Sequence, residues 1–93
     1  MAKIIWTKQS IKDLKSIFDY IALDSKYYAG RLIKRLVLRT DQLEVFPESG
    51  RIVPEKEDSN IREIIEGNYR IFFRFSRGVI TILRVHNSAR KIK

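Results

Sequence analysis

A segment of two-residue alternation, residues 69–76, constrains the fold of this chain more than any other feature. Its odd-numbered positions are all apolar and the positions between them are mostly polar: the first set is Tyr69, Ile71, Phe73 and Phe75, and the second is Arg70, Phe72, Arg74 and Ser76. Because successive side chains of a β-strand point to opposite faces, this segment is predicted to be a strand with one apolar face and one arginine-bearing face. A second layer must cover the apolar face.

Turn-forming residues separate this strand from one predicted strand on each side. Gly67-Asn68 and Ser76-Arg77-Gly78 are typical of hairpin turns, so strands are expected at residues 61–66, 69–76 and 79–86 in an antiparallel meander. We expect a three-residue loop, Ser76 to Gly78, in the second hairpin. This register sets Arg70 opposite Arg84 with His86 on the same side, whereas a two-residue loop would place Arg84 opposite Ile71 and bury it or divide the arginines.

The first half of the chain repeats apolar residues at helical spacing. Residues 3–6 form a short β-prone run, and Thr7 offers N-cap chemistry before a helix expected over about residues 9–22. Asp24 and Ser25 give the next cap signal, and a second apolar series then continues until Pro47 and Gly50 stop it. Its members, all expected on one helical face, are Tyr28, Ala29, Leu32, Ile33, Leu36, Val37, Leu43 and Phe46.

These segments together predict one α+β domain over residues 1–93, because a chain of this length buries one modest core. The connection between the helices is only two or three residues long, so they should form an antiparallel hairpin. We expect the order β-α-α-β-β-β, with the helix hairpin packed on one face of a mainly antiparallel four-stranded sheet.

Positive charge is concentrated in the predicted meander. Residues 61–93 hold eight Lys or Arg against Glu63 and Glu66, a balance of +6 within a total of +8. Two arginines directly opposite on a strand pair repel each other unless an anion or a carboxylate lies between them, so the arginine face is a candidate binding site for a phosphate or another anion. Alternatively, these arginines pair within the chain with Glu63, Glu66 or Glu55.

Composition argues against several other classes. The chain has no cysteine and one histidine, and its carboxylates are scattered, so we expect no metal site and no cofactor. No apolar stretch approaches a signal peptide or a membrane span, which favours a soluble cytoplasmic protein with no membrane partner. A plain nucleic-acid-binding module is disfavoured because Phe72 is the one aromatic residue of its strand beside the arginines, too few for base stacking.

An ordered set of short motifs resembles the RelE/ParE family of bacterial toxins over essentially the whole chain. The motifs are Asp13-Leu14, Tyr20-Ile21-Ala22, Phe46-Pro47, Gly50-Arg51-x-Val53-Pro54-Glu55, Ile61-Arg62-Glu63, Gly67-Asn68-Tyr69-Arg70-Ile71, Phe73-Arg74, Arg84-Val85-His86 and Arg90. The resemblance implies the toxin of a type II toxin–antitoxin module, also called a plasmid stabilisation protein. It also implies a small acidic antitoxin that neutralises the toxin in a hetero-oligomer.

The resemblance implies two alternative targets. RelE-like members are ribosome-dependent mRNA endoribonucleases (mRNA interferases), and by this likeness Arg70, His86 and Arg90 would be catalytic. ParE-like members inhibit DNA gyrase without catalysis. In either case the likeness and the charge pattern predict target or phosphate contacts at these positions: Arg62, Arg70, Arg74, Arg84 and Arg90.

Departures from the nuclease pattern favour the gyrase branch. The best-studied nucleases carry lysines along the strand where this chain has Ile61 and Glu63, and some use a C-terminal tyrosine-bearing helix where this sequence ends at Lys93. The loop before the meander is also acidic on balance, which is unfavourable for a surface lying against ribosomal RNA. A histidine at a strand end is also often structural, and an inactive family member kept as a structural or regulatory partner is a further alternative.

Overall fold

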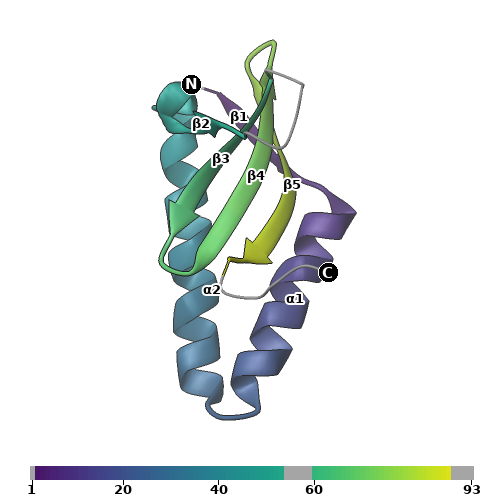
Figure 1. The fold of residues 1–93 in the computed structure, drawn as a ribbon, viewed down its shortest axis with the longest axis vertical. Helices are drawn as coiled ribbons and strands as arrows, with labels where there is room; N and C mark the ends of the chain where they lie inside the picture. The colour runs from purple at the N-terminus through teal and green to yellow at the C-terminus, as the bar shows by residue number, and fades with distance from the viewer. Residues whose placement is uncertain (1, 54–59, 89–93) are drawn as a thin grey trace.

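The computed structural model of this chain describes residues 2–53 and 60–88. Its elements follow the order β1 (Lys3–Trp6), α1 (Lys8–Ala22), α2 (Lys26–Asp41), η1 (Gln42–Glu44), η2 (Pro47–Ser49), β2 (Arg51–Ile52), β3 (Ile61–Glu66), β4 (Tyr69–Ser76) and β5 (Val79–Asn87). The predicted α+β fold is confirmed, with one strand more than expected because the two-residue β2 adds to the sheet. Figure 1 shows the two helices as an antiparallel hairpin that extends past one end of the sheet.

Side-chain caps begin both helices at the residues that the sequence indicated. The Thr7 hydroxyl accepts a hydrogen bond from the Ser10 N–H at 3.1 Å, and the Ser25 hydroxyl accepts one from the Tyr28 N–H at 3.2 Å. The second helix is shorter than predicted, since it ends at Asp41 and two short 3₁₀ turns follow it. In consequence Phe46 lies exposed rather than on the buried face.

The sheet has the strand order β1-β5-β4-β3-β2. β1 runs parallel to β5, and the remaining pairs are antiparallel. The helix hairpin connects β1 to the meander and returns the chain to the end of the sheet where β1 begins. This connection allows β1 and β5 to run in the same direction. The bounds of β3, β4 and β5 agree with the predicted strands, apart from one additional residue, Asn87, at the end of β5.

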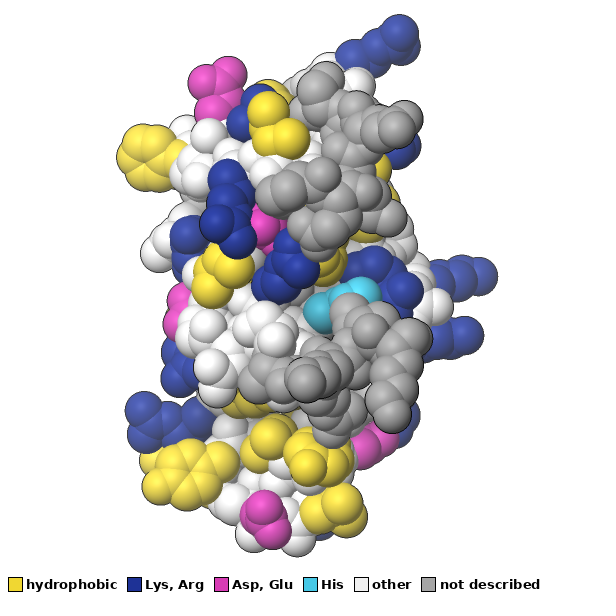
Figure 2. Space-filling model, viewed as in Figure 1, with side chains coloured by type: hydrophobic (Ala, Val, Ile, Leu, Met, Phe, Trp, Pro, Cys, Tyr) yellow, Lys and Arg dark blue, Asp and Glu magenta, His cyan; other side chains and the backbone are white. Residues whose placement is uncertain are grey.

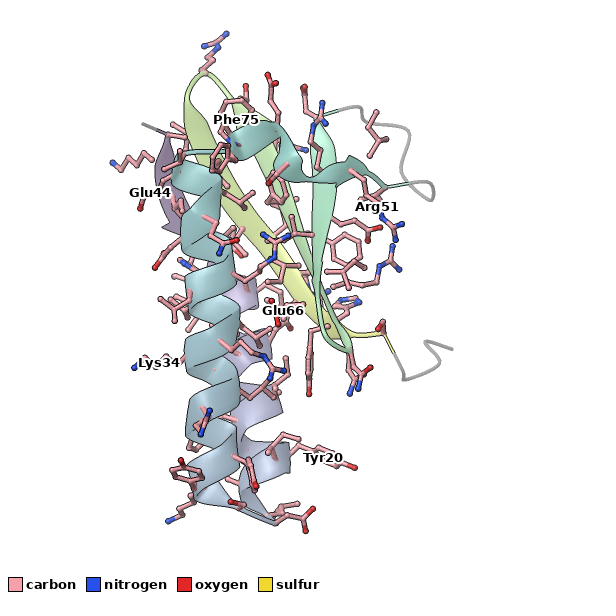
Figure 3. All side chains as sticks on the ribbon, turned by 90° about the vertical axis from the view of Figure 1, so that its left-hand side faces the viewer. Tyr20, Lys34, Glu44, Arg51, Glu66 and Phe75 are labelled. Atoms are coloured by element: carbon pink, nitrogen blue, oxygen red, sulfur yellow. The ribbon has the colours of Figure 1, made fainter. Side chains whose placement is uncertain are left out.

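The core lies between the hairpin and one face of the sheet. Its most buried members are Leu36, Leu43, Ile64, Tyr69, Ile71, Phe73, Ile80, Ile82 and Val85. The apolar alternation of β4 therefore faces the helices as predicted, and Figure 3 shows the helices and the sheet as two layers seen from the side. The predicted apolar face of the second helix is only partly correct. Leu36 is fully buried, as expected, but Tyr28 is exposed at the far end of the hairpin.

The predicted register of the last hairpin is wrong. Ser76 pairs with Val79, so the turn has two residues, Arg77 and Gly78. Both have positive φ, 53° and 76°, which is the backbone geometry that matches the twist of a two-residue hairpin. The short turn alone would set Arg84 opposite Ile71.

A β-bulge within the same hairpin then shifts the pairing of β4 and β5 by one further residue. Phe73 pairs with Ile82 but Phe72 pairs with Arg84, so Leu83 is an additional residue in β5. The bulge places Arg84 on the same face as Phe72 and sets Arg70 opposite His86. The expected Arg70–Arg84 pair does not form.

Neither helix within residues 2–53 and 60–88 combines the length and the apolar character that a membrane span requires.

Candidate functional site

The candidate site is the sheet face turned away from the helices, which we call the open face. Register places these residues, among others, on it: Arg51, Glu63, Arg70, Phe72, Arg74, Arg84 and His86. Figure 2 shows several Lys and Arg side chains on this side of the molecule, close to the histidine. The alternation of β4 is therefore sufficient to bring basic and aromatic side chains together on one surface.

A buried carboxylate lies at the centre of this face. Glu63 Oε1 accepts a hydrogen bond from Arg70 Nε and Oε2 accepts one from Arg51 Nε, both at 2.6 Å. The Glu63 side chain is 0% exposed, whereas that of Arg70 is 22% and that of Arg51 is 65% exposed. Burial by itself would raise the pKa of Glu63, but the two guanidinium groups outweigh it and lower this pKa below its ordinary value.

An aromatic contact holds Arg70 from the other side. Its guanidinium carbon lies 4.8 Å from the centre of the Phe72 ring, and the Phe72 ring in turn meets His86 edge to face at 5.4 Å. Phe72 is only 9% exposed although it is on the open face. Arg70 is therefore fixed by a carboxylate and by a ring, and it lies beside His86 as a cross-strand neighbour.

A second carboxylate joins α1 to the sheet. Asp13 accepts hydrogen bonds from Arg84 Nε at 2.8 Å, Arg84 Nη2 at 3.3 Å and the Val85 N–H at 2.9 Å, and Gln9 donates a fourth at 3.0 Å. Burial acts to raise the pKa of Asp13, yet these donors together lower it. In the same contact, the Asp13 hydrogen bond raises the pKa of Arg84. Arg84 thus pairs with Asp13, a residue that the sequence did not indicate as its partner.

The remaining predicted contact residues are Arg62, Arg74 and Arg90. Arg62 pairs with Phe73, so it alternates toward the opposite face, and its Nη1 donates to the Gly50 carbonyl at 3.2 Å. Arg74 is exposed on the open face. Arg90 lies outside the described residues. The expected cluster of unpaired guanidinium groups is therefore wrong for Arg70 and Arg84, and the alternative that Arg70 pairs with Glu63 is confirmed.

Two residues of the site were missed as functional candidates. Arg51 and Asp13 both belong to motifs of the family resemblance, but no sequence pattern assigned either of them a role in the site. A signal for Arg51 was available, because Glu63 lies on an arginine-bearing strand and needs a partner if its side chain is buried. No local pattern indicates Asp13, whose partner Arg84 lies 71 residues away.

A shallow cleft of about 320 Å³ lies between α1 and the end of β5. Its lining combines polar and aromatic side chains, namely Asp13, Tyr20, Tyr69, Arg84 and His86. Among the described residues, no group of three or more His, Asp or Glu side chains is arranged to hold a metal ion.

Comparison with known proteins decides the family. A model of the ParE toxin of the type II toxin–antitoxin system parDE matches residues 4–92, almost the whole chain. This chain belongs to the ParE toxin family. The toxin is also 33% identical over 91 residues to Toxin RelE2 of Caulobacter vibrioides, covering 97% of this chain and 99% of that protein. It is 33% identical over 88 residues to the putative toxin Y4kP of Sinorhizobium fredii, covering 90% and 88%.

Two solved structures share the fold of the toxin. A chain of the chromosomal ParDE system from P. aeruginosa superposes with a TM-score of 0.77 at 25% identity, covering 94% of the toxin and 96% of that chain. A chain of the RelBE2 toxin–antitoxin complex from Mycobacterium tuberculosis superposes with a TM-score of 0.72 at 19% identity, covering 92% and 96%, which is a likeness of fold alone. The names of these relatives include both ParE and RelE, so they do not separate the two targets.

Proposed function

We propose that this toxin arrests growth by ParE-like inhibition of DNA gyrase, through binding rather than catalysis. The observation that supports this choice is the pairing of Arg70 and Arg84 with carboxylates of the same chain. Cleavage of RNA through its 2′-hydroxyl needs cations placed around the phosphorane, together with groups that take and give protons. Here Glu63 and Asp13 already occupy two of the arginines that would have to supply the positive charge.

The RelE-like alternative, a ribosome-dependent mRNA endoribonuclease, is supported by a different observation. Arg70 and His86 are directly opposite on β4 and β5, so two of the three residues named as catalytic for a nuclease are neighbours. Histidine titrates in the range that suits proton transfer. The similarity to Toxin RelE2, at 33% identity, also supports this alternative.

The partner that we propose for neutralisation is a small acidic antitoxin. The toxin carries a net charge of +8, which favours fast association with an acidic chain. The hairpin end also exposes apolar and aromatic side chains that a folding segment could cover: Tyr20, Leu23, Tyr27 and Tyr28. Hydrophobic side chains collect at this end of the molecule in Figure 2.

Growth arrest followed by two biochemical assays tests the proposed target. After induction in a bacterium, purified toxin is added to a gyrase supercoiling reaction, and ribosome-bound message from the same cells is examined for cleavage by primer extension. We expect loss of supercoiling with intact message. Cleaved message with normal supercoiling would reject the gyrase assignment, and growth arrest with neither effect would reject both mechanisms.

A charge-reversal variant tests whether the open face contacts the target. Arg74 is the suitable residue because it is exposed on the open face. We expect R74E to weaken gyrase inhibition more than it weakens antitoxin binding. An equal loss of both would contradict the assignment of this face to the target.

A further inference from the structure

Glu63 is unusual because its charge is buried on the face that is otherwise most basic. A carboxylate that is fully removed from solvent is costly unless charged hydrogen-bond donors surround it. Glu63 has two such donors, Arg51 Nε and Arg70 Nε, each at 2.6 Å and each on a different oxygen. One side chain thereby fixes two guanidinium groups at once.

This arrangement changes what those guanidinium groups can offer a ligand. A phosphate that approached Arg51 or Arg70 would come close to the Glu63 charge directly behind them, so repulsion would offset much of the attraction. Arg70 is also held over the Phe72 ring and is mostly buried, so it cannot turn outward without losing both contacts. Both arginines are present on the open face, but the Glu63 charge offsets one of their two positive charges and engages the Nε of each.

We propose that Glu63 is a specificity-determining residue of this toxin. By holding Arg51 and Arg70, it prevents the open face from binding the phosphodiester backbone of a nucleic acid. The proposal deepens the proposed function, on which it rests, because it names the residue that makes this face unsuited to an RNA substrate. The ligand class it excludes is a phosphodiester chain, whether RNA or DNA.

A matched control is available on the same strand. Glu66 also forms ion pairs with two arginines, at 3.3 Å from Arg35 Nε and 3.9 Å from Arg39 Nε, but on the helix side of the sheet. Figure 3 shows Glu66 toward α2 and Arg51 on the opposite side of the sheet. Glu63→Gln and Glu66→Gln therefore change the net charge equally, and they differ in which arginines they release.

The test measures binding of a short fluorescein-labelled single-stranded RNA, and of DNA of the same sequence, by fluorescence anisotropy at fixed salt. We expect E63Q to bind both about tenfold more tightly than E66Q, the size expected when one nearby, partly screened charge is neutralised. Adding Arg70→Gln to E63Q should remove the gain. Thermal unfolding of each variant establishes that it is folded. Equal affinities of folded E63Q and E66Q would overturn the proposal.

A measurement on the unchanged toxin covers the case in which E63Q does not fold. Titration of the same RNA into ¹⁵N-labelled toxin is followed through the arginine Nε–H signals. We expect the Arg51 and Arg70 signals to stay in place. Shifts of the Arg51 and Arg70 signals on RNA addition would overturn the proposal. Neither readout depends on gyrase. A failed supercoiling assay would therefore reject gyrase as the target without deciding whether Glu63 limits nucleic-acid binding.

Discussion

Replacing Asp13 with Asn tests the contact that joins α1 to the last strand. All four groups that face the two carboxylate oxygens are donors, from Gln9, from Arg84 twice and from the Val85 backbone. An Asn side chain has only one acceptor oxygen, so its NH₂ group must face a donor in either orientation. The least costly orientation keeps the oxygen on Arg84 Nε and Val85 N and turns the NH₂ toward Gln9 and Arg84 Nη2.

The expected loss of unfolding free energy follows from these contacts. Hydrogen bonds to a charged group contribute about 1.5–3 kcal/mol, but half-exposed Arg84 recovers part of its loss from water, which leaves about 2 kcal/mol for D13N. For a domain of this size, such a loss lowers the melting temperature by about 8–16 °C. Urea unfolding followed by circular dichroism measures the free energy directly.

Asp19 provides the control within the same helix. It pairs with Lys15 at 2.8 Å, but both side chains are well exposed, so D19N should cost no more than about 0.5 kcal/mol. The same Asp-to-Asn substitution is thereby made at a solvent-exposed ion pair and at the contact that joins α1 to β5. If D13N unfolds like D19N, the contact between Asp13 and Arg84 does not stabilise the fold and the reasoning fails.

Further predictions concern the stability of the fold at acidic pH and the effect of replacing two glycines with alanine. Folded-state pKa values of Asp13 and Glu63 are lowered from reference values of 3.8 and 4.5, so the stability they contribute is present above these values and is lost as the pH falls through them toward the folded-state pKa. Urea unfolding from pH 6 to pH 2 should show this loss, and a D13N or E63Q variant with an unchanged slope would contradict it. Gly30→Ala should stabilise by about 0.5–1 kcal/mol, because a Cβ in this helix meets nothing within 4 Å. Gly50→Ala should destabilise by about 1–3 kcal/mol, because its Cβ would overlap the Phe73 ring; equal melting temperatures of the two variants would refute the packing argument.

The open face was only partly predictable from the sequence. The alternation of β4 placed Arg70, Phe72 and Arg74 on one face, and the structure agrees. The partner of Arg70 was among the alternatives, since Glu63 was considered as a carboxylate that could neutralise it. The opposite partner on β5 could not be predicted, because the turn and the bulge each shift the pairing by one residue.

The sequence by itself determined the two helices, the strands β1, β3, β4 and β5, and their order, but not β2 or the end of α2. Helical and strand periods, the caps at Thr7 and Ser25 and the glycines of the hairpins are local signals, and each acts through neighbours within a few residues. Their agreement with the observed elements follows from that short range. The apolar face of β4 also required the helix layer that covers it.

Only the tertiary structure decided how the arginines are used. The bulge at Leu83 and the sharing of Glu63 by Arg51 and Arg70 depend on how neighbouring strands pair, and the salt bridge of Arg84 to Asp13 joins residues 71 positions apart. A guanidinium group binds whichever carboxylate packing brings within reach, and a one-residue shift of register changes that neighbour. Local periodicity carries no information about such a shift. The arginine partners therefore depend on the strand register of the folded sheet, β2 included, and on its packing against α1.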